Sequence, residues 1–306
     1  MSHVPLTQAR PVTLRSASTG SAVWHRRWQA IRRQKDLLVG SAIILVVVAA
    51  AILAPVIGRE GIRDVNLTAR LKPPFWLPNG YPGSLLGTDQ LGRDIFTRLV
   101  YGARISLTVA IVSVVCSAAI GVLIGVISGF YGGITDALLM RIVDVFLAFP
   151  GIILTIVILS FLGANIRNII LVLAVTQWVG YARMVRGIAL SLKEREFIES
   201  ARASGARNMR IILRHLLPNC MTPIGVLASL QVAGMILLES ALSFLGLGVQ
   251  PPTPSWGIMI SEGRQYLDTA WWISTMPGIA IIVTVLGVKF FSDGAAAILD
   301  PRTRRN

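Results

Sequence analysis

The sequence predicts an all-α, polytopic membrane protein with six transmembrane helices, and three observations support this prediction. First, 54% of the 306 residues are hydrophobic and only 14% are charged, whereas about 25% of the residues in soluble domains are charged. Second, the apolar residues form stretches close to the roughly 20 residues that a helix needs to cross the hydrocarbon layer. Third, most basic residues lie between these stretches, as is typical of membrane topology. Membrane lipid is therefore an expected partner.

The net charge of +14 has two interpretations, a nucleic-acid partner or the excess of basic residues on the inner side of membrane proteins. The positions of the basic residues favour the second. Residues 1–36 carry seven Lys or Arg and one acidic residue, Asp36. We therefore expect a cytoplasmic N-terminal tail over 1–36 and no nucleic-acid partner. Six spans then also put the C-terminal tail, residues 299–306, in the cytoplasm.

The first span is predicted at residues 37–58, a stretch of 22 residues without a charge. It is longer than the apolar core of a cleaved signal peptide, so we expect it to remain as a membrane anchor. Residues 59–104 carry seven basic and four acidic residues and are expected to form a periplasmic loop, because long loops are translocated largely regardless of charge. Near its end, Thr88 or Asp89 is expected to cap a helix that an Asp94–Arg98 pair supports.

Five further spans are expected within residues 105–298. The fourth has only 15 uncharged residues, Asn168 to Ala182, so it must continue past Arg183 and Arg186, whose long side chains reach the interface. In chain order these spans are about 105–131, about 145–162 with a kink at Pro150–Gly151, a fourth that begins near 168, one within 216–248, and about 271–288.

The connection between the fourth and fifth spans, residues 187–219, is expected to be a cytoplasmic helical hairpin. Eight basic residues lie between Arg183 and Arg214, which places the connection on the inner side. Gly205 separates two helices, where the turn needs a residue that tolerates positive φ. The expected apolar residues are Phe197, Ile198 and Ala201 in the first helix, and Met209, Ile212, Leu213, Leu216 and Leu217 in the second.

The hairpin also carries a set of residues at fixed spacing. This spacing resembles the cytoplasmic signature of ABC importer permeases, which is E-A-A, three residues, G, nine residues, I-x-L-P. Ser200 stands where the signature has its middle alanine, and His215 stands where it has isoleucine. The positions that carry the resemblance are Glu199, Ser200, Ala201, Gly205, His215, Leu217 and Pro218.

Further segments resemble the peptide/nickel branch of this family, and in particular its C-type permeases for dipeptides, oligopeptides or glutathione. The resemblance implies a type I ABC importer permease in the bacterial inner membrane, with residues 105–298 as the permease domain. It implies a second homologous permease, two ABC ATPase subunits that dock on the hairpin, and a periplasmic or lipid-anchored solute-binding protein. It does not identify the solute. The segments are 86–94, 101–104, 140–144, 149–150, 243–248, 250–257 and 300–302.

Two interpretations stay open for Glu199. It is expected either to stabilise its helix through Arg195 and Arg202 or to contact the ATPase subunit. The resemblance implies that movement of the ATPases displaces the hairpin and changes the side to which the solute path opens.

The expected function is transport, without a catalytic residue or a cofactor on this chain. The sequence contains no G-x-x-x-x-G-K-[S/T] phosphate loop, so ATP and Mg are expected on the separate ATPase subunits. Three His and two Cys residues have no metal-binding spacing, so no metal site is expected. An ion-coupled secondary carrier or channel is the alternative function, and it leaves the hairpin unexplained.

Polar residues inside the spans are costly in lipid and are therefore candidates for the solute path. Glu239 in the fifth span is the first candidate, and Gln231 and Gln177 are weaker ones. Two alternatives stay open for Glu239, a side chain that reaches the outer interface and one that pairs with the partner permease. Asp144 stands three residues after Arg141, and we expect these two to form an ion pair at the start of the third span.

Overall fold

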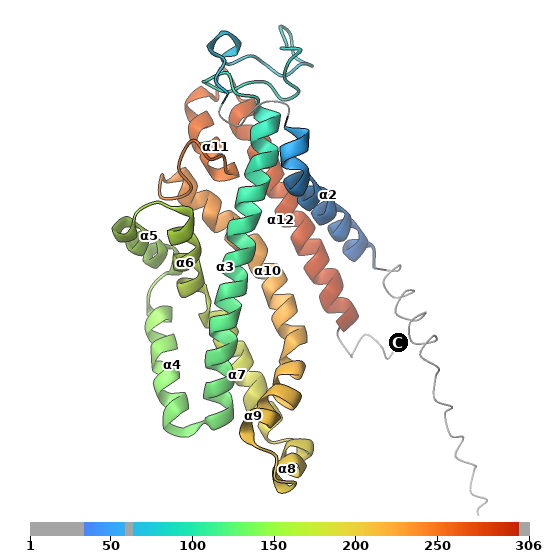
Figure 1. The fold of residues 1–306 in the computed structure, drawn as a ribbon, viewed down its shortest axis with the longest axis vertical. Helices are drawn as coiled ribbons and strands as arrows, with labels where there is room; N and C mark the ends of the chain where they lie inside the picture. The colour runs from blue at the N-terminus through green and yellow to red at the C-terminus, as the bar shows by residue number, and fades with distance from the viewer. Residues whose placement is uncertain (1–33, 59–63, 300–306) are drawn as a thin grey trace, which may run out of the picture.

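The fold is an elongated bundle of helices (Figure 1). The computed structural model describes residues 34–58 and 64–299 of the chain. These ranges contain no β-strand. Most of the predicted N-terminal tail, His3, His25 and residues 300–306 lie outside the described residues. The helices are α2 (Lys35–Ile57), α3 (Ile95–Tyr131), α4 (Gly133–Ala148), α5 (Gly151–Leu162), α6 (Ile166–Gln177), α7 (Val179–Lys193), α8 (Glu196–Ala203), α9 (Asn208–Ile211), α10 (Leu217–Phe244), α11 (Trp256–Gly263) and α12 (Trp272–Leu299), with short helical turns η1 (Leu67–Ala69), η2 (Ile212–Leu216) and η3 (Arg264–Tyr266).

Among the described residues, five helical units are long and apolar enough to cross a membrane, and the number is six if the bent pair of α4 and α5 counts as one span. Two of the five units consist of more than one element, because α6 runs on into α7, and α9 runs through η2 into α10. The exposed side chains of α2 include Leu45, Ile52 and Val56. Lipid tails are as apolar as these side chains. The protein is therefore an all-α, multi-pass membrane protein.

The third predicted span differs most from the expectation. Its first helix begins at Gly133, not near residue 145, and the expected kink is a bend of 88° between α4 and α5, so that α5 projects sideways from the bundle (Figure 1). The cause is local, because a residue before proline is driven out of the α region. Phe149, directly before Pro150, accordingly has extended backbone with φ −106° and ψ 136°.

The ion pair expected between Arg141 and Asp144 is wrong. Both residues lie inside α4 and are exposed, because the helix starts eight residues before Arg141 at Gly133. No ion pair joins them in the described part of the chain. They therefore do not mark the start of a span.

The second span begins about ten residues earlier than predicted, at Ile95. The N-cap residue of this helix is Asp94, whose carboxylate accepts a hydrogen bond from the backbone N–H of Thr97 at 2.8 Å. The N-cap predicted at Thr88 or Asp89 is therefore wrong. The 37 residues of α3 make a helix of about 55 Å. Because this exceeds the thickness of the hydrocarbon layer, one end of α3 extends beyond it.

A buried ionic network fixes the extended end of α3. Asp89 pairs with Arg93 (Oδ2–Nε, 2.6 Å) and with Arg98 (Oδ2–Nη1, 2.5 Å), and Arg98 also pairs with Glu262 of α11 (Nη2–Oε2, 2.7 Å). The pair expected between Asp94 and Arg98 is thus replaced by these contacts. Two acids and two arginines pair with one another, as buried charges require, and the Nε atom of Arg98 is left without a partner among the described residues. The network joins the irregular segment 64–94, which we call the cap, to α3 and α11.

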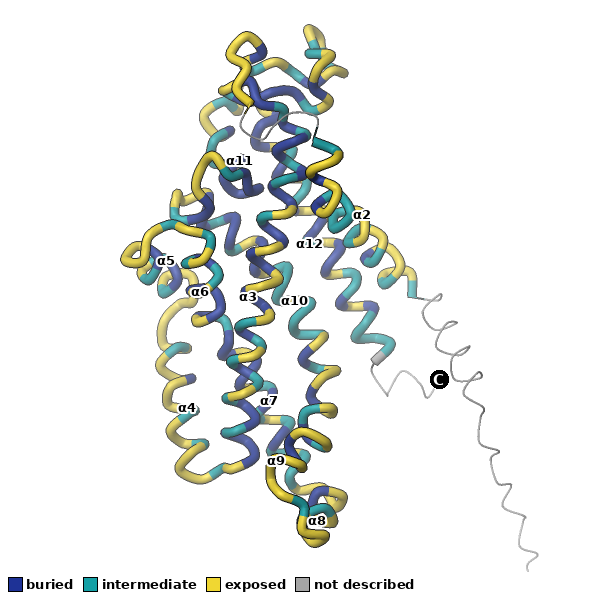
Figure 2. Tube along the Cα trace, in the orientation of Figure 1, coloured by how far each residue is buried: buried dark blue, intermediate teal, exposed yellow. Residues whose placement is uncertain are grey.

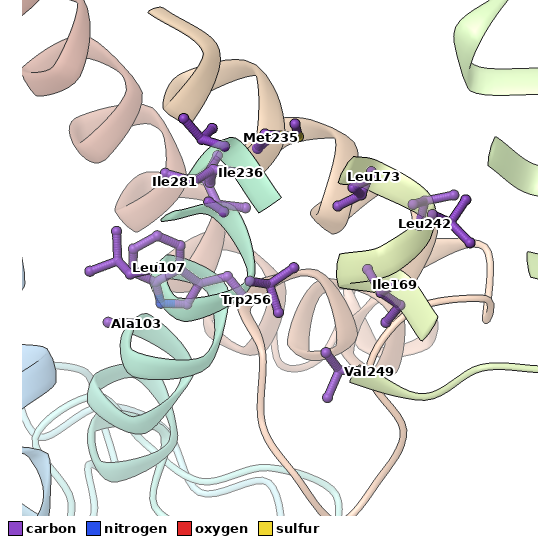
Figure 3. Packing of buried hydrophobic residues seen from close by; sticks show 14 of the residues in the cluster. Ala103, Leu107, Ile169, Leu173, Met235, Ile236, Leu242, Val249, Trp256 and Ile281 are labelled. Carbon is purple, nitrogen blue, oxygen red and sulfur yellow. The ribbon is translucent and has the colours of Figure 1, made fainter. Parts of the chain in front are cut away.

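The apolar core at the same end is built around Trp256, the first residue of α11. Figure 3 shows its ring beside Ala103 and Leu107 of α3, within the main cluster of buried hydrophobic residues. The indole N–H donates to the carbonyl oxygen of Leu99 at 3.0 Å. Both the apolar body and the polar atom of Trp256 are therefore satisfied, which anchors α11 on α3.

Helices α3 and α7 are in close backbone contact along three glycines of α3, which are spaced by four residues. A methyl group on Gly125 would lie 2.6 Å from the carbonyl oxygen of Ala182, and one on Gly121 would lie 2.4 Å from that of Trp178. Gly129 is similarly close to the backbone of α7. Small residues allow this approach in membranes, where dispersion contacts rather than the hydrophobic effect drive helix association. The two helices therefore form one rigid pair.

We predict that Gly125→Ala destabilises the protein by about 1–3 kcal/mol through overpacking, although alanine ordinarily favours helices over glycine. The matched control is Gly225→Ala in α10, where the added methyl group meets no atom within 4 Å. This control should leave stability unchanged or raise it by about 0.5–1 kcal/mol. Thermal unfolding of the purified variants in detergent tests the prediction, and equal midpoints for the two would contradict the close contact.

Candidate functional site: the hairpin between the fourth and fifth spans

The hairpin is anchored on the end of the α3–α7 pair by its first helix, α8. Ile198 is only 1% exposed and belongs to a buried cluster with Phe130 of α3 and Val185 of α7. The guanidinium of Arg202 lies 5.5 Å from the centre of the Phe130 ring, a favourable cation–π distance. One apolar side chain and one cation thus hold α8 against the two helices.

The opposite face of α8 is exposed and carries two of the predicted site residues. Glu199 and Ser200 are exposed, and Ala201 is half-buried. The expected pairs of Glu199 with Arg195 and Arg202 are absent from the described residues, and the guanidinium of Arg202 lies over Phe130 instead. The Glu199 carboxylate is consequently available to another molecule.

Gly205 ends α8 in the conformation that the sequence predicts. Its φ is +77°, which lies in the left-handed region that favours glycine. The N–H of Gly205 donates to Arg202 and that of Ala206 donates to Ala201, at 2.9 and 3.0 Å. This is the Schellman arrangement, which satisfies the last carbonyl groups of a helix. Nothing lies within 4 Å of a methyl group at Gly205, so only the backbone conformation requires glycine in this chain.

The apolar stripe predicted for the second helix is partly wrong. Met209 and Leu213 are exposed, whereas Ile211, Ile212 and Leu216 are buried. The helix α9 has only four residues and is followed by a π-helical turn, η2, which changes the face to which later residues point. A stripe extrapolated at 3.6 residues per turn therefore assigns the wrong side chains to the core.

The remaining signature residues lie in or after this π-helical turn. His215 and Leu217 are half-buried, and Pro218 is exposed in the first turn of α10, where its missing N–H costs little. The His215 ring is 6.1 Å from the ring of Phe197 in α8. The signature thus brings both halves of the hairpin into contact.

A concave surface of about 600 Å³ lies at the turn of the hairpin and the start of its second helix. Two arginines give it a basic character, and Met209 adds an exposed apolar side chain. The lining residues are Gly205, Arg207, Asn208, Met209 and Arg210. This surface and the outward face of α8 are the accessible parts of the hairpin.

Gln177 and Gln231 lie close to glycines on neighbouring helices. The amide nitrogen of Gln177, the last residue of α6, lies 3.6 Å from a methyl group built on Gly151 at the start of α5. That of Gln231 lies 3.6 Å from one built on Gly180 in α7, and the Gln231 side-chain oxygen is buried without a partner among the described residues. Gln177 thus lies beside the bend between α4 and α5, and Gln231 lies beside α7.

Glu239 is placed differently from either expectation. It is 0% exposed, and its carboxylate accepts hydrogen bonds from Ser106 at 3.0 Å and from Ser243 at 2.7 Å. Ser106 in turn accepts the backbone N–H of Trp256 at 3.3 Å. The side chain does not reach the surface, so the expected contact with the interface or with a partner permease is not formed. Glu239 instead links α10 to α3 and α11.

Cys220 is buried and Cys116 is half-buried, and both are free thiols. Within the described ranges no group of three His, Cys, Asp or Glu residues is arranged to hold a metal ion.

One ion pair, at the end of the bundle that carries the hairpin, was not predicted from the sequence. Arg186 of α7 donates to both carboxylate oxygens of Asp136 in α4, at 2.6 and 2.7 Å, and Ser128 of α3 donates to the same carboxylate. The available signal was the isolated acidic residue four positions after Gly132 in an otherwise apolar region. The sequence does not reveal the partner, which lies 50 positions away.

These features define a multi-pass helical membrane protein with an exposed hairpin, and comparisons with known proteins identify its class. Residues 121–305 match the family described as the inner membrane component of binding-protein-dependent transport systems. Residues 23–74 match the N-terminal transmembrane domain of oligopeptide transport permease C.

Related permeases cover nearly the whole chain. The di/tripeptide transport system permease protein of Pseudomonas aeruginosa is 38% identical over 90% of this chain and 91% of its own length. The dipeptide transport system permease protein of Haemophilus influenzae is 37% identical over 100% of both. The glutathione transport system permease protein of Escherichia coli O6:K15:H31 is 39% identical over 92% of this chain and 91% of its own length.

A solved structure supports the fold. The MetNI methionine ABC transporter in an inward-facing conformation has a chain with a TM-score of 0.54, which is 23% identical and covers 66% of this chain and 96% of that chain. The chain therefore belongs to the family of inner-membrane permeases of binding-protein-dependent ABC importers. It is a transport subunit in a complex with an ATPase and a binding protein, and not an enzyme.

We predict that Glu239→Ala lowers the stability of the protein by about 1–3 kcal/mol, because it leaves the hydroxyl groups of Ser106 and Ser243 without their acceptor. Glu239→Gln retains an acceptor oxygen and should cost less. Thermal unfolding and membrane abundance measure both effects. Normal stability and abundance of Glu239→Ala together with lost uptake would contradict the structural role and put Glu239 on the solute path.

Proposed function

We propose that this chain forms, with a second homologous permease, the translocation path of an ATP-driven importer for di- or oligopeptides or a related small solute. The relatives support the class of solute, because three of them, each aligned over 90% or more of this chain, are named for dipeptides, di/tripeptides or glutathione. Glutathione is itself a modified tripeptide. The shared solute chemistry is thus a short peptide with charged ends.

The hairpin is proposed to be the docking point of the ATPase. The observation that carries this proposal is the two-sided character of α8, with Ile198 buried against α3 and α7 while Glu199 and Ser200 face outward. A partner that grips the outer face therefore moves two membrane helices through one buried side chain. The small residues Ser200, Ala201 and Gly205 allow the close approach of a folded subunit.

The remaining composition and the topology of the complex follow from this docking. Two ATPase subunits bind ATP and Mg, one below each permease, and a periplasmic or lipid-anchored solute-binding protein approaches the opposite end. The α8 end is cytoplasmic, and the cap and α11 lie in the periplasm. Both tails, 1–36 and 299–306, are cytoplasmic, and residues 187–219 form the coupling loop of the permease domain.

The solute path is proposed to pass Gln177 and Gln231. Support comes from the position of Gln177 beside the bend at Phe149–Pro150 and of Gln231 beside Gly180 of α7, since irregular backbone inside a membrane is tolerated where it lines a cavity or is buried in protein. Glu239 stabilises the helices around this path through its hydrogen bonds to Ser106 and Ser243. Displacement of α8 changes the side to which this path opens.

We predict that Ser200→Trp removes the ATPase from the purified complex, because the large ring on the exposed face of α8 blocks close approach. Thr68→Trp in the cap, also at an exposed residue, is the matched control and should retain it. Copurification of the ATPase with the tagged permease measures the effect. Retention in Ser200→Trp would contradict docking at α8, and solute uptake by the permease alone in liposomes, driven by an ion gradient, would favour a carrier.

A further inference from the structure

The backbone changes direction sharply at both ends of helix α4. It begins after two consecutive residues with positive φ, Gly132 at +68° and Gly133 at +56°, and it ends at the 88° bend before α5. Val143 is its single buried residue, and most of its other residues are exposed (Figure 2). By contrast, α3 and α7 are held together along the glycines of α3. Of these three helices, α4 has the fewest buried residues.

Apolar contacts hold the second half of α4. Val143 is in a small cluster with Trp178 and Ala182, and the Phe146 ring lies 5.4 Å from that of Trp178. Burial of apolar surface is non-directional, and of these contacts only the edge-to-face pair of rings is oriented. Together they keep the second half of α4 near α7.

The first turn of α4 is held by directional contacts. Asp136 receives two hydrogen bonds from Arg186 of α7 and one from Ser128 of α3. A bidentate arginine–carboxylate pair fixes orientation as well as distance. The Arg186 and Asp136 side chains are 34% and 18% exposed, so the pair is accessible in part and its residues can be replaced without opening a buried core.

The pair lies near the point where α8 joins the bundle. From Arg186, α7 continues to Lys193, a distance of about 10 Å along the helix, and α8 follows. Phe130, which α8 contacts through Ile198 and Arg202, is two residues after Ser128. A displacement of α8 therefore reaches α3 and α7 beside the Asp136 carboxylate.

We infer that Asp136 and Arg186 are positioning residues that make α4 follow α3 and α7 when α8 is displaced. This inference rests on the proposed docking of an ATPase at α8. With the pair intact, the three helices move together, and the bend beside Gln177 moves with them. When the pair is removed, α3 and α7 still move, but α4 does not follow them because the backbone bends at both of its ends.

The test measures the separation of α3 and α4 in the purified complex with its ATPase. Leu123 of α3 and Leu138 of α4, both exposed, are replaced by spin-labelled cysteines in a chain whose Cys116 and Cys220 have been substituted. Double electron–electron resonance then gives the distribution of distances between the two labels with and without ATP. The wild-type pair should give one distribution in both conditions. Asp136→Asn and Arg186→Gln should keep ATP hydrolysis but show a shifted or broadened distribution when ATP is added.

Three further variants separate positioning from general damage. The exchange of Asp136→Arg with Arg186→Asp should restore the wild-type distribution, and Arg186→Lys should restore it in part, because lysine keeps the charge but not the bidentate geometry. Asp293→Asn, in the exposed Lys289–Asp293 pair of α12, is the control and should change nothing.

Three results overturn the inference. An unchanged distribution in an ATPase-containing Asp136→Asn complex contradicts it alone, and so does a shift in Asp293→Asn of the same size as in Asp136→Asn. A wild-type chain that copurifies no ATPase contradicts the proposed function, and the inference falls with it.

Discussion

The close contact of α3 with α7 is the constraint on which the rest of the structure depends. Three glycines at intervals of four residues remove the side chains that would separate the two backbones. In lipid, where apolar groups have no preference for one another over the solvent, such an approach is a principal source of association. One partner of this pair reaches the cap, and the other continues into α8. The contact therefore gives the two ends of the molecule a common rigid axis.

Charged side chains fix the elements that surround this axis at both ends. At one end, Arg98 bridges Asp89 of the cap and Glu262 of α11. At the other, Arg186 binds Asp136 of α4 with two parallel hydrogen bonds. Both arginines belong to the α3–α7 pair, and both donate hydrogen bonds to carboxylates of neighbouring elements. The apolar core supplies most of the burial, while these pairs decide the angle at which each neighbour is held.

The sequence predicts those features that depend on local chemistry. Uncharged stretches locate the spans, and Gly205 predicts the turn of the hairpin because its positive φ is a property of one residue. Contacts between distant residues were not predicted. Arg93 donates to Glu262 at 3.3 Å, although the two residues are 169 positions apart, and hydropathy carries no information about such pairs. The π-helical turn at Ile212–Leu216 also escaped prediction, because it changes the period on which the predicted apolar stripe was based.

The account requires that α8 and the cap lie on opposite sides of the membrane, with α8 in the cytoplasm. The direct measurement is labelling of Ser200→Cys and Thr68→Cys by a membrane-impermeant thiol reagent, in a chain whose Cys116 and Cys220 are replaced. In cells with a permeabilised outer membrane and an intact inner membrane, Thr68→Cys should be labelled and Ser200→Cys should be protected until the inner membrane is opened. Labelling of Ser200→Cys from outside an intact inner membrane would contradict its role as the docking point of an ATPase.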